Sequence, residues 1–545
     1  MKFNVGNNLQ LRESAEEGAS PEAIGRKVVE MYNKDPRLRI NLPPVPEQGT
    51  WTAKFGYKFE HPVPVSWSSD EIIRLFRFCK QEGVHFHVLV YGPQGPKITL
   101  DTVQNILDVA SDCCEGFEIG EVYNGRTFVE ADVPYAQGKE QESVEFLKSL
   151  IELAKETGKK VFWTEHCHDG PGRYAGRDDD PRWRVGWWGF ALCDTDIFKE
   201  FFDGRYADTL VMTHETNDPR CLPINLMTVL GTWLSGGVSE WGFNLQSWFW
   251  NDARFGTRKI PEKTEDFGET AFLNCQECPP DLIFRQALEA VGLGAQYIQF
   301  APDNMIWEQK SENRFELARQ YREGIKPFFE LLDKGIISPP AKDRIRSFSP
   351  LALRLTANNP THVWRDGLFS PGDPRITPES KNLPTAEVYL PRYIYGEEKL
   401  YRGILLKTPY GIVPFLPPWA SKETLDRFDE VFDTNSKEIM DPISGQSRKG
   451  LEACSFLVER LKAARDKMLV GSHRVGLHLW EEDGFYKAIL IRGLFSQREE
   501  VELDLNQLQG YQIEDAETGE PITKTDGKAK VKLSKRGHRI LKLYK

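Results

Sequence analysis

Short apolar runs alternate with amphipathic segments over the first 340 residues of the chain. Eight runs have the pattern of strands, at residues 3–5, 39–45, 85–92, 116–122, 159–165, 208–215, 236–243 and 295–302. Helical periodicity lies between them at 20–34, 68–83, 142–158 and 279–294, often with a Ser or Asp cap signal at the start and Gly at the end. Strands that alternate with helices predict an α/β fold, a (β/α)8 TIM-like barrel over residues 1–340.

The pattern changes after the Pro-rich segment at 336–344. Short alternating strands separated by turn signals follow, as in HRVGLHLWEEDGFYKAILIRGLF and KAKVKLSKRGHRILKLYK. This pattern predicts a C-terminal antiparallel β-sandwich over 341–545, interrupted by helices near 421–432 and 448–468.

Carboxylates occur repeatedly where the predicted barrel strands end. The reactive groups of (β/α)8 enzymes sit at the C-terminal ends of the strands, so these acids are the first candidates for chemistry. Two carboxyl groups with different pKa values can supply the acid and the base of glycoside hydrolysis. The simpler interpretation, in which individual acids only anchor loops through ion pairs, stays open for each of them. The candidates are Glu121, Glu165, Glu215, Glu240 and Asp303.

Aromatic residues are concentrated in two segments beside these strand ends. Residues 231–256 contain Trp233, Trp241, Trp248 and Trp250 among Ser, Asn and Gln side chains, and the loop at 177–190 contains Trp188. Flat aromatic faces can stack on sugar rings while amides such as Asn244 and Gln246 hydrogen bond to hydroxyls. We expect Trp250 and Trp188 to border a cleft, and packing in the core is the alternative.

Four motifs resemble glycoside hydrolase family 98. They are FEIGEVYNG, GTWLSGGVSEWGFNLQSWFW, QFAPDNMIW and TPYGIVPFLP, which lie between residues 117 and 417. The resemblance implies an endo-acting β-glycosidase that cleaves with inversion, on a substituted xylan or a galactose-containing blood-group glycan. It also implies a catalytic barrel followed by a β-sandwich.

The resemblance implies roles for individual acids. By position, Glu121 matches the general acid and Asp303 the base carboxylate, with Glu240 as the third acid and Asp252 as its alternative. Strands four and eight lie on opposite sides of an eight-stranded ring, so Glu121 and Asp303 would have the wide separation, about 6.5–9.5 Å, that inversion requires. The further residues expected to bind substrate are Glu215, Glu165, Trp188, Trp250, Asp252 and Tyr123.

Charge and composition narrow the class of partner. A formal net charge of −11 argues against a broad nucleic-acid surface, and no stretch reaches the roughly 18 apolar residues of a membrane span. The start of the chain lacks the pattern of a secretory signal, which predicts a cytoplasmic protein as it stands, or a secreted one if the chain is a trimmed form. Nine scattered cysteines do not form the framework of a disulfide-rich domain.

We expect no metal and no cofactor. The segment EHCHD at 165–169 contains metal-ligating residue types, but neighbouring residues at a strand end point to opposite faces. The expected partner is a carbohydrate polymer or oligosaccharide. A non-catalytic carbohydrate-binding protein on a barrel scaffold and a barrel hydrolase of another linkage remain as alternatives, because a fold does not fix a function.

Overall fold

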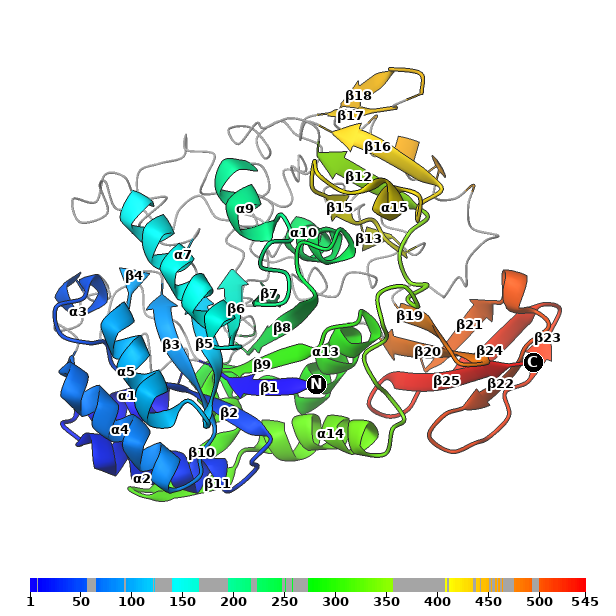
Figure 1. Cartoon of the computed structure of the whole chain (residues 1–545). Helices are drawn as coiled ribbons and strands as arrows, with labels where there is room; N and C mark the ends of the chain where they lie inside the picture. The colour runs from blue at the N-terminus through cyan, green and yellow to red at the C-terminus, as the bar shows by residue number, and fades with distance from the viewer. Residues whose placement is uncertain are drawn as a thin grey trace.

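Eight parallel strands close into a barrel (Figure 1). Each strand pairs with the next one along the ring, and β1 also pairs with β9, so that the ring has no free edge. This closed parallel sheet confirms the predicted (β/α)8 fold class. The strands are β1 (Lys2–Val5), β2 (Leu38–Leu42), β3 (Phe86–Gly92), β5 (Cys114–Gly120), β6 (Lys160–Glu165), β7 (Leu210–Glu215), β8 (Glu240–Gln246) and β9 (Tyr297–Ala301).

The computed structural model of the chain describes most of this barrel and parts of the C-terminal region that follows it in the sequence. The described ranges are residues 1–6, 8–55, 65–92, 95–120, 140–165, 195–216, 223–247, 273–355, 411–434, 438–441, 443–449, 475–492 and 499–545. Shorter described pieces are 122, 250, 257, 407–408, 452, 456–457, 459–460 and 463.

Helices surround the barrel on its outside. Ser20, Ser68 and Thr99 each accept a backbone N–H bond and so begin α2, α4 and α5. In Figure 1, α2, α4, α5 and α7 lie along one side of the barrel, and α13 and α14 lie along another. The helices are α1 (Leu9–Glu16), α2 (Pro21–Tyr32), α3 (Trp51–Phe55), α4 (Ser69–Gln81), α5 (Leu100–Ala110), α7 (Glu140–Glu156), α9 (Thr195–Phe202), α10 (Pro223–Leu234), α13 (Pro280–Gly292) and α14 (Lys326–Asp333). Among the described residues, no helix is long and apolar enough to cross a membrane.

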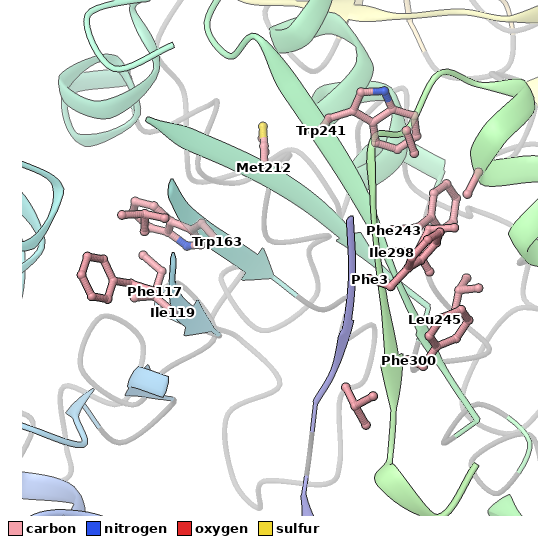
Figure 2. Close-up of a cluster of buried hydrophobic side chains, with 14 of the residues drawn as sticks. Phe3, Phe117, Ile119, Trp163, Met212, Trp241, Phe243, Leu245, Ile298 and Phe300 are labelled. Atoms are coloured by element: carbon pink, nitrogen blue, oxygen red, sulfur yellow. The ribbon is translucent and has the colours of Figure 1, made fainter. Parts of the chain in front are cut away.

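Side chains alternate between the two faces of each barrel strand. On β8, Trp241, Phe243 and Leu245 belong to the large hydrophobic cluster that also contains side chains of the surrounding helices (Figure 2). Gly242 faces the other way, because a Cβ at this position would lie 2.6 Å from the ring of Tyr297. Tyr297 in turn bonds to β5, on the opposite side of the ring, so it lies inside the barrel. The even-numbered residues of β8 therefore face the interior.

Residues 475–545 contain two antiparallel sheets. One has the order β19-β20-β25-β22 and the other β21-β24-β23, and both contribute to one buried apolar cluster. Two sheets packed on a shared core form a β-sandwich, as predicted for the C-terminal part. The strands are β19 (Val475–Glu482), β20 (Phe485–Arg492), β21 (Glu500–Asp504), β22 (Gln512–Asp515), β23 (Lys524–Thr525), β24 (Lys528–Lys532) and β25 (His538–Tyr544).

A separate sheet lies between the barrel and this sandwich in the sequence. Its central strand β12 (Leu351–Leu355) runs parallel to both β15 (Phe415–Leu416) and β16 (Glu430–Thr434), and β17 (Glu438–Met440) and β18 (Ser447–Lys449) continue it in antiparallel fashion. The expected helix near 421–432 is only the short α15 (Lys422–Leu425), and β18 occupies the start of the helix expected at 448–468. Alternating hydrophobicity predicts strands without their direction, which is why an entirely antiparallel region was the wrong expectation here.

The barrel packs against the C-terminal region of the chain. Trp480, Ile489 and Ile540 of the sandwich belong to the same hydrophobic cluster as the barrel helices. A Cβ at Gly231 of α10 would lie 2.1 Å from the carbonyl oxygen of Phe415, so the backbones of α10 and β15 are in close contact. The division of the chain at residues 340 and 341 stays a prediction.

Candidate active site

Three of the predicted acids lie at the C-terminal end of the barrel. Glu165 is the last residue of β6, Glu215 is the last residue of β7, and Asp303 follows β9 in a short 3-10 turn. All three are buried. They occupy the end of the barrel where enzymes of this fold carry their active sites.

Glu215 faces the interior of the barrel at this end. Two residues earlier on β7, Thr213 donates a hydrogen bond to Thr164 of β6, and a further two residues earlier Val211 packs on Tyr297 inside the barrel. By the alternation of the strand, Glu215 has the same orientation. Gln246, the last residue of β8, donates from Nε2 to Glu215 Oε1. An amide donor at this place fixes the orientation of the carboxylate.

Glu165 has a different environment. Trp163 Nε1 donates a 2.8 Å hydrogen bond to Glu165 Oε1. The Trp163 ring packs against Phe201 and Phe202 of α9, which lies outside the barrel. Glu165 is thus tied to the outer face of β6, and its expected contact with substrate stays a prediction.

Asp303 caps the N-terminus of α1, although the two are far apart in the sequence. Its Oδ2 accepts a 3.1 Å hydrogen bond from the backbone N–H of Gln10, in the first turn of α1, whose own N-cap Asn8 makes no side-chain cap bond. The side chain is fully buried, and burial raises the pKa of Asp303 to about 8 although the N–H donors of α1 lower it. Its Oδ1 has no hydrogen-bond partner in the part of the chain that the structure describes. Asp303 therefore caps α1, and burial shifts its equilibrium toward the protonated form, whereas a general base acts as the carboxylate.

Glu240 lies at the wrong end of the barrel for catalysis. It is the first residue of β8, and it pairs with Lys2 at 3.4 Å and Lys160 at 3.7 Å, which begin β1 and β6. The expectation that Glu240 ends its strand is corrected by this position. Gly236 has a φ of +78°, so the segment GGVS forms a turn and the strand begins only at Glu240.

The position of Glu240 leads to a prediction. We expect Glu240→Gln to leave catalytic activity unchanged, because the carboxylate is on the N-terminal face of the barrel. The loss in stability should be at most about 1 kcal/mol, since partly exposed ion pairs contribute little. Activity assays and thermal melting of the variant check both statements, and a large fall in turnover would return Glu240 to the site.

Several predicted site residues lie outside the described residues. These are Glu121, Tyr123, Trp188 and Asp252. Trp250 is described and half-buried, and it packs against the edge of the large hydrophobic cluster. Trp233 and Trp241 are fully buried core residues with ring centroids 6.2 Å apart, so packing accounts for these two members of the aromatic segment.

The interior of the barrel contains a buried polar network that the sequence did not predict. Glu118 of β5 accepts hydrogen bonds from Tyr297 at 2.6 Å and Gln299 at 3.3 Å, and it contacts His87 Nδ1 at 2.7 Å. Gln299 continues the network by donating to Asn4. Burial and the Glu118 carboxylate raise the pKa of Tyr297 well above its usual value. Polar residues at inward positions of otherwise apolar strands are the signal that could have located this network.

Metal-ligating side chains do not gather in the described part of the chain. No group of three or more His, Cys, Asp or Glu there could hold an ion. Of the segment at 165–169, only Glu165 is described.

Comparison with known proteins supports a relation at the level of the fold. No protein-family model matches the sequence, and no curated protein matches it. The structure is similar to the catalytic module of a family 98 glycoside hydrolase from Streptococcus pneumoniae, with a TM-score of 0.50 at 12% identity over 92% of this chain and 76% of that one. The same module in complex with the H-disaccharide blood group antigen gives a TM-score of 0.49 at 13% identity, over 92% and 76% of the two chains. A family 42 beta-galactosidase from G. stearothermophilus gives 0.44 at 10% identity, over 100% and 94%. The resemblance to family 98 found in the sequence motifs is thus matched by a similarity in fold.

Proposed function

We propose that this protein is a glycoside hydrolase that cleaves internal β-linkages of a polysaccharide or glycan. The observation that carries the proposal is the carboxylate of Glu215, buried at the C-terminal end of β7 and held there by Gln246. The sequence motifs and the similarity in fold to a family 98 catalytic module support it. A pair of carboxyl groups at the mouth of a barrel would supply the acid and the base of glycoside hydrolysis.

Two carboxyl groups carry the proposed reaction. Glu121, which follows β5, is the general acid that protonates the leaving oxygen, as the family motif implies. Glu215, which ends β7, is the base that takes the proton of the attacking water. We assign this role to Glu215 in place of Asp303 because Asp303 caps α1 and its burial raises the pKa of its carboxyl.

The proposal extends to the stereochemistry of cleavage and to the class of substrate. The family motifs support a single displacement that inverts the anomeric carbon. They also support a substituted xylan or a galactose-containing glycan as substrate, and the solved family 98 module binds a blood group disaccharide. The charge of −11 agrees with a neutral sugar partner.

The size of the products tests the proposal. Purified protein is incubated with arabinoxylan and with blood-group glycans, and the products are separated by length. We expect oligosaccharides of intermediate length from one of these substrates, as internal cleavage requires. Binding of a glycan without any cleavage would instead identify a non-catalytic carbohydrate-binding protein.

A further prediction concerns the half-buried Trp250. We expect Trp250→Ala to weaken substrate binding by about 1–3 kcal/mol, as loss of an aromatic anchor does elsewhere. Calorimetric titration with the cleaved oligosaccharide measures this, and thermal melting is recorded in parallel. A lower melting temperature with unchanged binding would show that Trp250 serves packing only.

A further inference from the structure

The C-terminal half of β8 carries two inward amides with different surroundings. Gln246 donates to Glu215, as described above. Asn244, two residues earlier, is 2% exposed, and its Oδ1 has no hydrogen-bond partner among the described residues. A buried polar atom without a partner loses its bonds to water and gains nothing in return. Inside the barrel, by contrast, the side chains of Asn4, Gln246 and Gln299 all make hydrogen bonds.

Asn4 provides the comparison. It lies on β1, which is separated from β8 by β9. Its side chain is fully buried and also faces the barrel interior. Its Nδ2 donates to Asn41 at 2.7 Å and its Oδ1 accepts from Gln299 at 2.9 Å. The barrel therefore satisfies a buried asparagine where the residue serves structure alone.

The position of Asn244 places it beside the proposed base. In the register of the sheet, Asn244 pairs with Glu215 on β7 and with Gln299 on β9. It thus lies on the inner face of the strand next to β7, beside the residue whose carboxylate ends that strand. Its own backbone oxygen is bonded to Thr216 N at 3.0 Å, so the backbone around the side chain is fixed.

We propose that Asn244 is a substrate-binding residue whose amide hydrogen bonds to hydroxyl groups of the sugar bound next to Glu215. The inference rests on the proposed function and adds to it a residue that recognises hydroxyl groups of the substrate. A carboxamide offers an acceptor and donors in one plane, which matches two neighbouring hydroxyls, one donating to the oxygen and the other accepting from the nitrogen. The ligand class is therefore a sugar with a free vicinal diol at the residue bound there.

The test compares the same change at two asparagines. Asn244→Leu and Asn4→Leu are made in the full chain, and melting temperature is measured without ligand. Binding of xylohexaose and of the blood-group H disaccharide is measured by calorimetry. Asn244→Leu removes a side-chain oxygen that has no partner among the described residues, so the melting temperature should stay equal or rise. The affinity for the bound probe should fall at least about tenfold, since the hydroxyls lose their partner.

Asn4→Leu should behave in the opposite way. It leaves Asn41 and Gln299 without their partner, so the melting temperature should fall while affinity for the probe is kept. If Asn244→Leu does not fold, Asn244→Ala replaces it, with the same expected loss of affinity.

The outcomes separate this inference from the proposed function. Unchanged affinity in Asn244→Leu, or a fall in melting temperature as large as that of Asn4→Leu, would overturn the inference alone. The first result points to an internal water as the partner of Oδ1, and the second to a structural role. Failure of the unaltered protein to bind either probe would overturn the inference together with the proposed substrates.

Discussion

Glu215→Gln is expected to reduce turnover at least about 100-fold, the lower end of what a general base contributes. The substitution keeps the size of the side chain and its place beside Gln246, but a carboxamide cannot take a proton from water. Glu121→Gln should have an effect of the same order, because the leaving oxygen then receives no proton. Steady-state rates on the cleaved polysaccharide measure both variants.

Two controls make the result specific. Substrate affinity and melting temperature of Glu215→Gln should stay close to those of the unaltered protein, since only the reacting group changes. Glu240→Gln, at the opposite end of the barrel, should keep full activity. Near-normal rates in Glu215→Gln would exclude it as the base.

Asp303→Asn is expected to stabilise the protein near pH 8 and to change nothing near pH 4. Burial raises the pKa of Asp303 from 3.8 to about 8. Between these values the folded chain holds the proton that the unfolded chain has lost, so stability falls as the pH rises through this window. An asparagine does not titrate and removes that loss, and its Oδ1 can still accept the N–H of Gln10. Thermal melting from pH 4 to pH 8 follows the difference.

Asp303→Ala is the matched variant. It also removes the titrating group but loses the acceptor for α1, so it should be less stable than Asp303→Asn by about 1 kcal/mol, the usual value of a helix cap. Asp303→Asn should keep most of its activity. A loss of activity as large as that of Glu215→Gln, with unchanged melting temperature, would give the role of base back to Asp303.

The barrel itself was predictable because its strands have a strong local signature. Buried parallel strands appear as apolar runs, and cap residues such as Ser20 and Ser68 mark where helices begin. The start of β8 was misplaced, since GGVS before Glu240 has the apolar pattern of a strand and the turn at Gly236 depends on its backbone. The parallel direction of the strands around β12 could likewise not be predicted, because β12 pairs with β15 and β16, which are far from it in the sequence.

The candidate site was predictable only in part. The prediction that Glu215 ends its strand is confirmed, and its role stays a prediction. The contacts of Asp303, by contrast, depend on a helix nearly 300 residues away in the sequence. Burial and pairing decide which carboxylate can act, and neither can be read from residue order. The same holds for Asn244, whose distinguishing property is a missing partner among the described residues.

The anomeric signals of a cleaved oligosaccharide, followed by proton NMR at early times, show whether this protein hydrolyses a β-glycoside with inversion. Unaltered protein should release new reducing ends whose first configuration is opposite to that of the β-linkage, and Glu215→Gln should release them at least about 100 times more slowly. Saturable binding of the oligosaccharide with no new reducing ends would contradict the claim that this protein is a glycoside hydrolase.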